Sequence, residues 1–183
     1  MPDYSFVDEM LAELPPQADD KAWSPIVKEL VDLWLYDYST FGSPSGSVWT
    51  TVDKANYLFS VTDSRLIAAW GVSGGRVDHK RDSSRQKQSP KGGDTYVHRG
   101  HAIPHTLGGG LDINLVPQLG RINTGPFQIL EGEARDHPGA LYFTYWSYKL
   151  SDIRGGPRAQ RPGRVEQGLL IPGQAAKISR FIN

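Results

Sequence analysis

Hydrophobic residues recur at helical spacing in two segments near the start of the chain. The first begins at Ser5 and ends at the proline pair 15–16, with apolar residues three and four positions apart. The second has Ser24 as its predicted N-cap and Pro25 in the first helical position, and it fades near Tyr38. Both segments are predicted to be amphipathic helices with one apolar side turned toward the rest of the protein.

Beyond a glycine- and serine-rich loop at 41–47, the pattern changes to one typical of β structure. A third helix is predicted at 126–136, where a His-Pro-Gly sequence stops it. Strands are predicted at residues 56–61, 65–72, 140–150 and 167–171. Helices at the start, strands later and a helix between strands indicate an α+β fold. The aromatic run at 142–146 is interpreted as core in preference to a platform for stacking bases.

Composition narrows the kinds of site that the chain can hold. It has 183 residues, 38% of them hydrophobic, and no cysteine, which excludes disulfides, thiolate zinc sites and cysteine nucleophiles. No apolar run approaches the roughly 18 residues of a membrane span. The acidic first residues do not resemble a signal peptide. We therefore expect no membrane partner, and a protein that is cytoplasmic or delivered into a target cell without a cleaved signal peptide.

The formal net charge is zero, but the charges are unevenly distributed. Residues 1–40 hold nine acids and two bases, and the remainder holds eighteen bases and eleven acids. Such a basic body can bind a polyanion. Six of the bases lie within 73–95, which is interpreted either as a mobile basic loop or as a solvated linker without a role. A second basic group is interpreted as a phosphate track or a solvated loop: Arg154, Arg158, Arg161 and Arg164.

The residues most suggestive of chemistry lie between 99 and 131. His101 follows a short predicted strand at 96–98 and precedes a glycine-rich turn, so its ring is expected to be exposed beside a groove. Asn114, Asn123 and Glu131 follow at intervals of nine and eight residues. Asn123 is predicted to lie just before the third helix and Glu131 about two turns along it. A neutral oxygen ligand with a carboxylate suits a Mg²⁺ ion that keeps most of its waters.

This ordered set resembles the DNA/RNA non-specific endonucleases of the ββα-metal (His-Me finger) class, and most closely their bacterial toxin-like branch. The matching positions are Arg99-Gly100-His101, Ile103, Gly108–Gly110, Asn114-Leu115-Val116-Pro117-Gln118, Asn123, Gly125 and Glu131. The sequence departs from the family at His98, where the family has an acid, and at Ala102, where it has leucine. The resemblance implies a ββα-metal core on an antiparallel sheet in a nuclease domain at 41–183, with 1–40 as an N-terminal helical segment packed on that domain. That segment is interpreted as a docking or shielding element, or simply as packed helices.

The resemblance also implies a role for each site residue. His101 would be the general base, which suits an imidazole with an ordinary pKa near 6.5. Asn123 would be a direct ligand of Mg²⁺, with Mn²⁺ as a substitute, and Glu131 would orient a water of the ion's hydration shell. Asn114 would position the histidine or the phosphate, and Arg99 would contact phosphate.

The function expected from this resemblance is magnesium-dependent, non-specific hydrolysis of phosphodiester bonds in DNA, with RNA as a further candidate substrate. By analogy with the toxin-like branch, the chain is a candidate antibacterial effector with an immunity protein as its partner. Two alternatives remain, a catalytically silent nucleic-acid-binding module and a protein-interaction module on the same fold. A zinc site at His101 and His105 is a weaker alternative, because no third ligand is placed.

Overall fold

A large antiparallel sheet forms the centre of the protein in the computed structural model, which describes residues 1–75, 97–110, 112–148 and 161–183. Its strands are β1 (Ser47–Val52), β2 (Ala55–Ser60), β3 (Arg65–Val72), β6 (Leu141–Ser147), β7 (Arg164–Leu170) and β8 (Lys177–Ile182). They lie in the order β1-β2-β3-β6-β7-β8, so the chain leaves the sheet after β3 and returns at β6.

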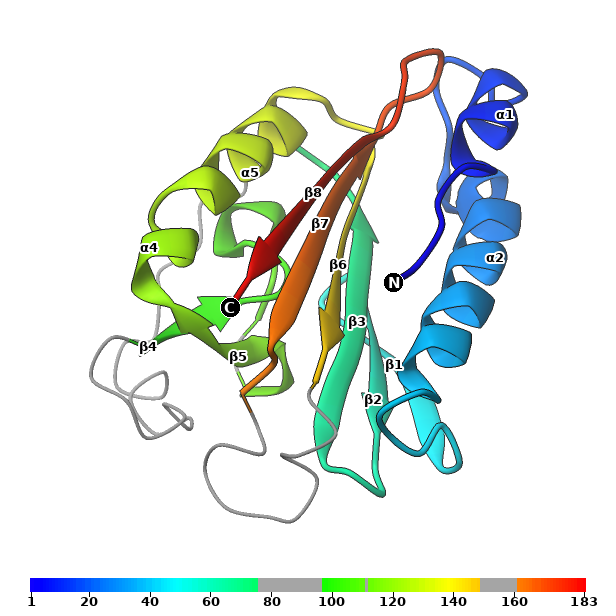
Figure 1. The fold of residues 1–183 in the computed structure, drawn as a ribbon. Helices are drawn as coiled ribbons and strands as arrows, with labels where there is room; N and C mark the ends of the chain where they lie inside the picture. Colours follow the sequence, from blue (N-terminus) through cyan, green and yellow to red (C-terminus); the bar gives the residue numbers. More distant parts are fainter. Residues whose placement is uncertain (76–96, 111, 149–160) are drawn as a thin grey trace.

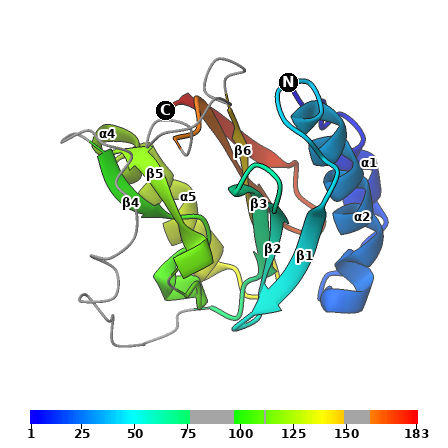
Figure 2. The same cartoon turned by 90° about the horizontal axis from the view of Figure 1, so that it is seen from below.

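The segment between β3 and β6 forms a second unit beside the sheet. Its described part, residues 97–110 and 112–136, holds an antiparallel pair of strands, two short 3-10 turns and two helices: β4 (Val97–His101), η1 (His105–Leu107), η2 (Asp112–Asn114), β5 (Leu115–Leu119), α4 (Gly120–Asn123) and α5 (Pro126–Asp136). The N-terminal helices, α1 (Val7–Ala12) and α2 (Asp20–Tyr38), cover the opposite face of the sheet. The sheet therefore separates a helical layer from the unit that carries the predicted site (Figures 1 and 2).

Strand β6 lies at the centre of this arrangement, and both of its faces are buried. On one face Phe143 and Tyr145 pack against Trp34 of α2, with ring centroids 5.2 and 6.1 Å apart. On the other face Trp146 packs against Phe127 of α5 at 6.3 Å. All five residues at 142–146 are buried between the two layers, which confirms their interpretation as core.

The helix at 126–136 has the predicted bounds, and the predicted strands at 56–61, 65–72, 140–150 and 167–171 correspond to β2, β3, β6 and β7. The predicted start of the second helix is wrong. Helix α2 begins at Asp20, and the side chain of Asp19 caps it by accepting a hydrogen bond of 2.8 Å from the Ala22 amide. Pro25 lies inside the helix. Asp19 therefore supplies the cap oxygen five residues before Ser24.

Within the large sheet, strands β1 and β8 are the two that the hydrophobic pattern does not predict. They are the edge strands of the sheet, and each pairs with a single neighbour. Much of β1 is exposed, including Trp49 and Val52, so its side chains show no regular alternation of burial. Among the described residues, no helix combines the length and the apolar character needed to span a bilayer.

Candidate active site

His101 is the last residue of β4 rather than the residue after a shorter strand. It pairs with Leu115, and the ladder runs back to a pair between Val97 and Leu119. Because side chains alternate along a strand, Arg99 and His101 share one face of β4. Both are half-buried, and Nε2 of His101 is shielded from solvent. The end of β4 therefore brings together a guanidinium and an imidazole, as the predicted contact with phosphate and the predicted base require.

Asn114 is fully buried and fixes the backbone just beyond His101. Its Oδ1 accepts a hydrogen bond from the Ile103 amide at 2.7 Å, and its Nδ2 donates to the Ile103 carbonyl at 2.9 Å. A further hydrogen bond of 2.8 Å links Nδ2 to the Gly110 carbonyl. The side chain thus acts through the backbone, and its position relative to a phosphate stays a prediction.

The glycine-rich turn closes over Asn114, and two of its glycines are required by geometry. Gly108 has a φ of +90°, a conformation that favours glycine. A Cβ on Gly109 would overlap the backbone carbonyl of Ile103. Strand β2 holds the turn from outside, where the hydroxyl of Tyr57 forms a hydrogen bond with the Gly110 backbone. Burial raises the pKa of that hydroxyl to about 12 despite this hydrogen bond.

Two hydrogen-bonded contacts attach the β4–β5 pair to the large sheet. The Thr144 hydroxyl of β6 donates to the carbonyl of Ala102, the residue after His101, at 3.2 Å. At the other end, the Oδ1 of Asn183 accepts from the Leu119 amide at 2.7 Å. Its Nδ2 donates to the carbonyls of Pro117 and Pro162, at 2.9 and 3.0 Å. The sheet therefore acts as the scaffold on which β4 and β5 are held.

Asn123 ends α4, three residues before α5 begins, and it lies beside β4. Its Nδ2 is 3.4 Å from Nδ1 of His98, which makes a long hydrogen bond. The His98 ring lies over Gly120, where an added Cβ would be 2.7 Å from Nε2. His98 thus contacts both ends of α4. In the sequence, His98 stands out only as a departure from the family pattern. Gly120, which leaves room for the His98 ring, is a signal that could have suggested the contact.

Gln118 is a further polar residue of the site that sequence reasoning did not assign. It pairs with His98 across the ladder and is completely buried. A Cβ on Gly100 would overlap the Gln118 side chain, which explains the glycine between Arg99 and His101. Within the described ranges neither amide atom of Gln118 has a hydrogen-bond partner. An unsatisfied buried amide costs about 1–3 kcal/mol, so this position suits an ordered water.

Glu131 lies on α5, and its charge acts on a residue of the large sheet. Burial is the first cause of the raised pKa of Tyr142 on β6, and the charge of Glu131 is the second, so the two side chains are close. Gln167 of β7 connects the same region, since its Nε2 donates to the Tyr142 hydroxyl and to the Phe127 carbonyl, both at 2.8 Å. Glu131 is half-buried on a helix that the sheet holds firmly.

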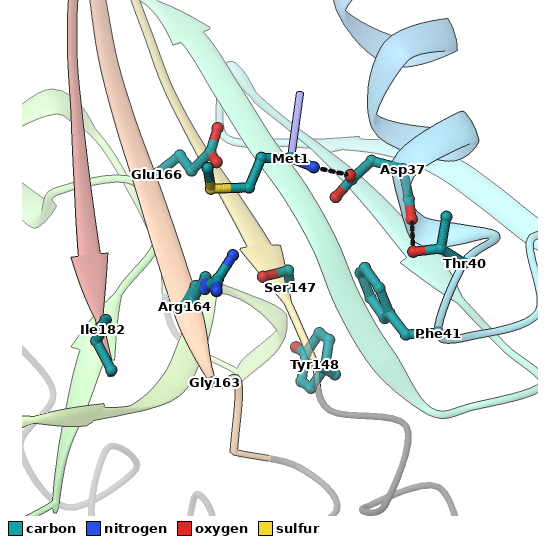
Figure 3. Close-up of a pocket in the computed structure, with 10 residues that line it drawn as sticks. All are labelled: Met1, Asp37, Thr40, Phe41, Ser147, Tyr148, Gly163, Arg164, Glu166 and Ile182. Atoms are coloured by element: carbon teal, nitrogen blue, oxygen red, sulfur yellow. Dashed lines mark hydrogen bonds and ion pairs between the residues drawn. The ribbon is translucent and has the colours of Figure 1, made fainter. Parts of the chain in front are cut away.

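An acidic pocket of about 460 Å³ lies apart from these residues, on the α2 side of the sheet (Figure 3). Asp37 and Glu166 line it, together with the N-terminal amine, which is 2.9 Å from Asp37. Burial, and the nearby charge of Asp37, raise the pKa of Glu166. None of the predicted site residues lines this pocket, although Arg164 of the predicted basic track does.

Several other predictions fall outside the described residues. These include the basic residues between 76 and 95, together with Arg154 and Arg158. His105 is described, and its ring centroid is 6.4 Å from that of His101. Within the described ranges no group of three or more histidine, aspartate and glutamate side chains is placed to hold a metal ion.

Comparison with known proteins finds a similarity in structure and none in sequence. No protein-family model matches the sequence, and no curated protein matches it. The structure is similar to a chain in the crystal structure of the EndoG/EndoGI complex, which is described as showing the mechanism of EndoG inhibition. The TM-score is 0.49 at 13% sequence identity, and the match covers 81% of this chain and 78% of that chain. The support for a function therefore comes from the site residues themselves.

Proposed function

We propose that the protein is a magnesium-dependent endonuclease that hydrolyses phosphodiester bonds in DNA, with RNA as a further candidate substrate. The observation that carries the proposal is the order of structure and chemistry around β4. An antiparallel pair of strands ends in Arg99 and His101, and the helices after β5 bear Asn123 and Glu131. Asn123 contacts β4 through His98, the residue before Arg99, so α4 is attached beside that strand.

Within this proposal each side chain has a defined task. The guanidinium of Arg99 binds a phosphate oxygen and holds the scissile group at the end of β4. His101 takes a proton from the attacking water. Because Nε2 is shielded from solvent, Nδ1 is the nitrogen assigned to that proton. Asn114 acts at one remove, by fixing the backbone of Ile103 and thereby the end of the strand.

The residues present fit a hydrated divalent cation. The amide oxygen of Asn123 is a hard ligand of the kind that Mg²⁺ binds, and the carboxylate of Glu131 can accept hydrogen bonds from surrounding water. The buried amide of Gln118, which has no partner among the described residues, offers another water position beside His98. When bound, the cation would stabilise the negative charge that develops on the phosphate and the departing oxygen.

The direct test is cleavage of supercoiled plasmid. Purified protein is expected to nick and linearise the plasmid in Mg²⁺ and in Mn²⁺, and to stop when EDTA removes the cation. Gel electrophoresis over pH 6–9 measures the conversion. An intact plasmid in Mg²⁺ across that range, accompanied by a gel shift, would favour the catalytically silent binding module. An intact plasmid without a shift would favour a protein-interaction module.

Cleavage is further expected to show little sequence preference and a steep dependence on salt. The contacts assigned here are to phosphate and water, and phosphate contacts carry no base information. Each neutralised phosphate releases counterions, so affinity falls linearly with salt on logarithmic axes. End-mapping of products from several plasmids checks the first expectation, and a gel-shift series in Ca²⁺ checks the second. Products that map to one recognition sequence would contradict the prediction of little sequence preference.

A further inference from the structure

The amide of Asn123 must be turned the right way if it is to bind a cation. Only its oxygen is a ligand, and the NH₂ group at the other position would repel a cation. The two orientations of the amide differ by a flip about the last side-chain bond. Some neighbouring group therefore has to distinguish the NH₂ from the oxygen.

His98 is in contact with that amide and is held in place from two sides. Its Nδ1 is 3.4 Å from Asn123 Nδ2, and its ring occupies the space that a side chain on Gly120 would fill. The ladder pair with Gln118 fixes its backbone. Gly120 and Asn123 are three positions apart and lie on the same side of α4, so the ring follows that side of the helix.

We propose that His98 is a positioning residue that orients the Asn123 amide for the cation, an inference that rests on the proposed function. Nδ1 of the neutral ring with its proton on Nε2 is a pure acceptor, so it binds the NH₂ and leaves Oδ1 turned away from the His98 ring. The neutral ring thus supplies an acceptor beside Asn123 without a negative charge. His98 itself does not touch the cation.

The test measures binding of Mn²⁺ rather than activity. Protein carrying His101→Ala, which leaves the DNA intact, is mixed with a short duplex, and Mn²⁺ is added while the free-ion EPR signal is recorded. His98→Phe keeps a ring over Gly120 but removes the acceptor. It is expected to weaken Mn²⁺ binding by about 10- to 100-fold, the usual effect of removing a group that orients a metal ligand. His98→Ala, which also removes the acceptor, is expected to act in the same direction.

Two further variants separate orientation from a general effect on structure. His98→Asn places an amide oxygen close to the position of Nδ1, and it is expected to restore binding to within about twofold of His98. Asn123→Asp has two equivalent oxygens and needs no orienting partner. In that background His98→Phe is expected to leave Mn²⁺ affinity unchanged, a non-additivity that marks direct coupling between the two side chains.

The controls distinguish failure of this inference from failure of the proposed function. His137→Phe makes the same change at a histidine on the far end of α5, whose Nδ1 contacts the Glu133 carbonyl, and it is expected to leave binding unaltered. If Asn123→Ala weakens Mn²⁺ binding while His98→Phe does not, the orienting role is wrong and the metal site stands. Equal losses from His98→Phe with Asn123 and with Asp at that position would also overturn it. If Asn123→Ala changes nothing, the proposed metal ligand fails, and the inference fails with it.

Discussion

His101→Ala is expected to remove turnover while preserving binding to DNA. Removal of a positioned base typically costs about 10²- to 10⁴-fold in rate. Arg99 remains in the variant, and it is the residue assigned to phosphate on the same face of β4. The imidazole is half-buried at a strand end, and replacing it by alanine leaves the backbone ladder intact. Single-turnover cleavage measures the first effect, and a gel-shift titration in Ca²⁺ measures the second.

The matched control is His105→Ala, which removes a neighbouring imidazole from η1. Its ring lies close to that of His101, so the two variants change local charge and volume in similar ways. We expect His105→Ala to lose far less rate than His101→Ala. A nearly inactive His105→Ala together with a nearly active His101→Ala would show that the base has been assigned to the wrong histidine.

Gly109→Ala is expected to give the largest loss of stability of any single-methyl substitution in the site. The added Cβ would overlap the Ile103 carbonyl, and Asn114 already holds that carbonyl and the Ile103 amide by one hydrogen bond each. Overpacking against flexible side chains costs about 1–3 kcal/mol, and a fixed backbone group cannot give way as they do. We therefore expect a loss of about 3 kcal/mol or more in the free energy of unfolding, measured by urea denaturation.

Gly110→Ala provides the comparison, because it changes the next residue of the same turn. Its Cβ would lie 3.5 Å from Oδ2 of Asp53, an ordinary van der Waals distance, and its φ is not in the left-handed region. This variant is expected to lose less than about 1 kcal/mol. Equal losses at the two positions would mean that the cost comes from the glycine backbone in general and not from the carbonyl of Ile103.

Elements that bury one regular stripe, or both faces, could be predicted from the sequence. The helix at 126–136 has a proline at its start and a buried stripe of Phe127, Leu130 and Ala134, so both its type and its bounds were readable. Strand β6 was readable because the five consecutive residues 142–146 are aromatic or threonine, which favour strands. Edge strands β1 and β8 were missed because each has a neighbouring strand on one side alone. Their side chains therefore do not alternate regularly between buried and exposed.

The candidate site shows the same division at the level of single residues. The order and spacing of His101, Asn123 and Glu131, together with the resemblance to the nuclease family, marked these residues as a base and hard oxygen ligands. The supporting contacts were not readable, because they join residues that are distant in the sequence. Examples are Thr144 with Ala102, and the placement of the Gln118 side chain on Gly100. The interpretation of Asn114 as a residue that positions the histidine or the phosphate could not anticipate that its amide bonds to backbone groups.

The hydrogen bonds from Asn183 to β5 set an order of events during synthesis. Strands β4 and β5 are synthesised well before residue 183. The Leu119 amide and the Pro117 carbonyl nevertheless form hydrogen bonds with the Asn183 side chain. Closing a contact across more than sixty residues is slow compared with forming a hairpin. A nascent chain that stops short of residue 183 therefore lacks these bonds, and the hairpin that carries His101 is not fully secured until residue 183 has left the ribosome. For a chain proposed to cut nucleic acid, the strands that carry the site therefore lack these hydrogen bonds while residue 183 is still inside the ribosome.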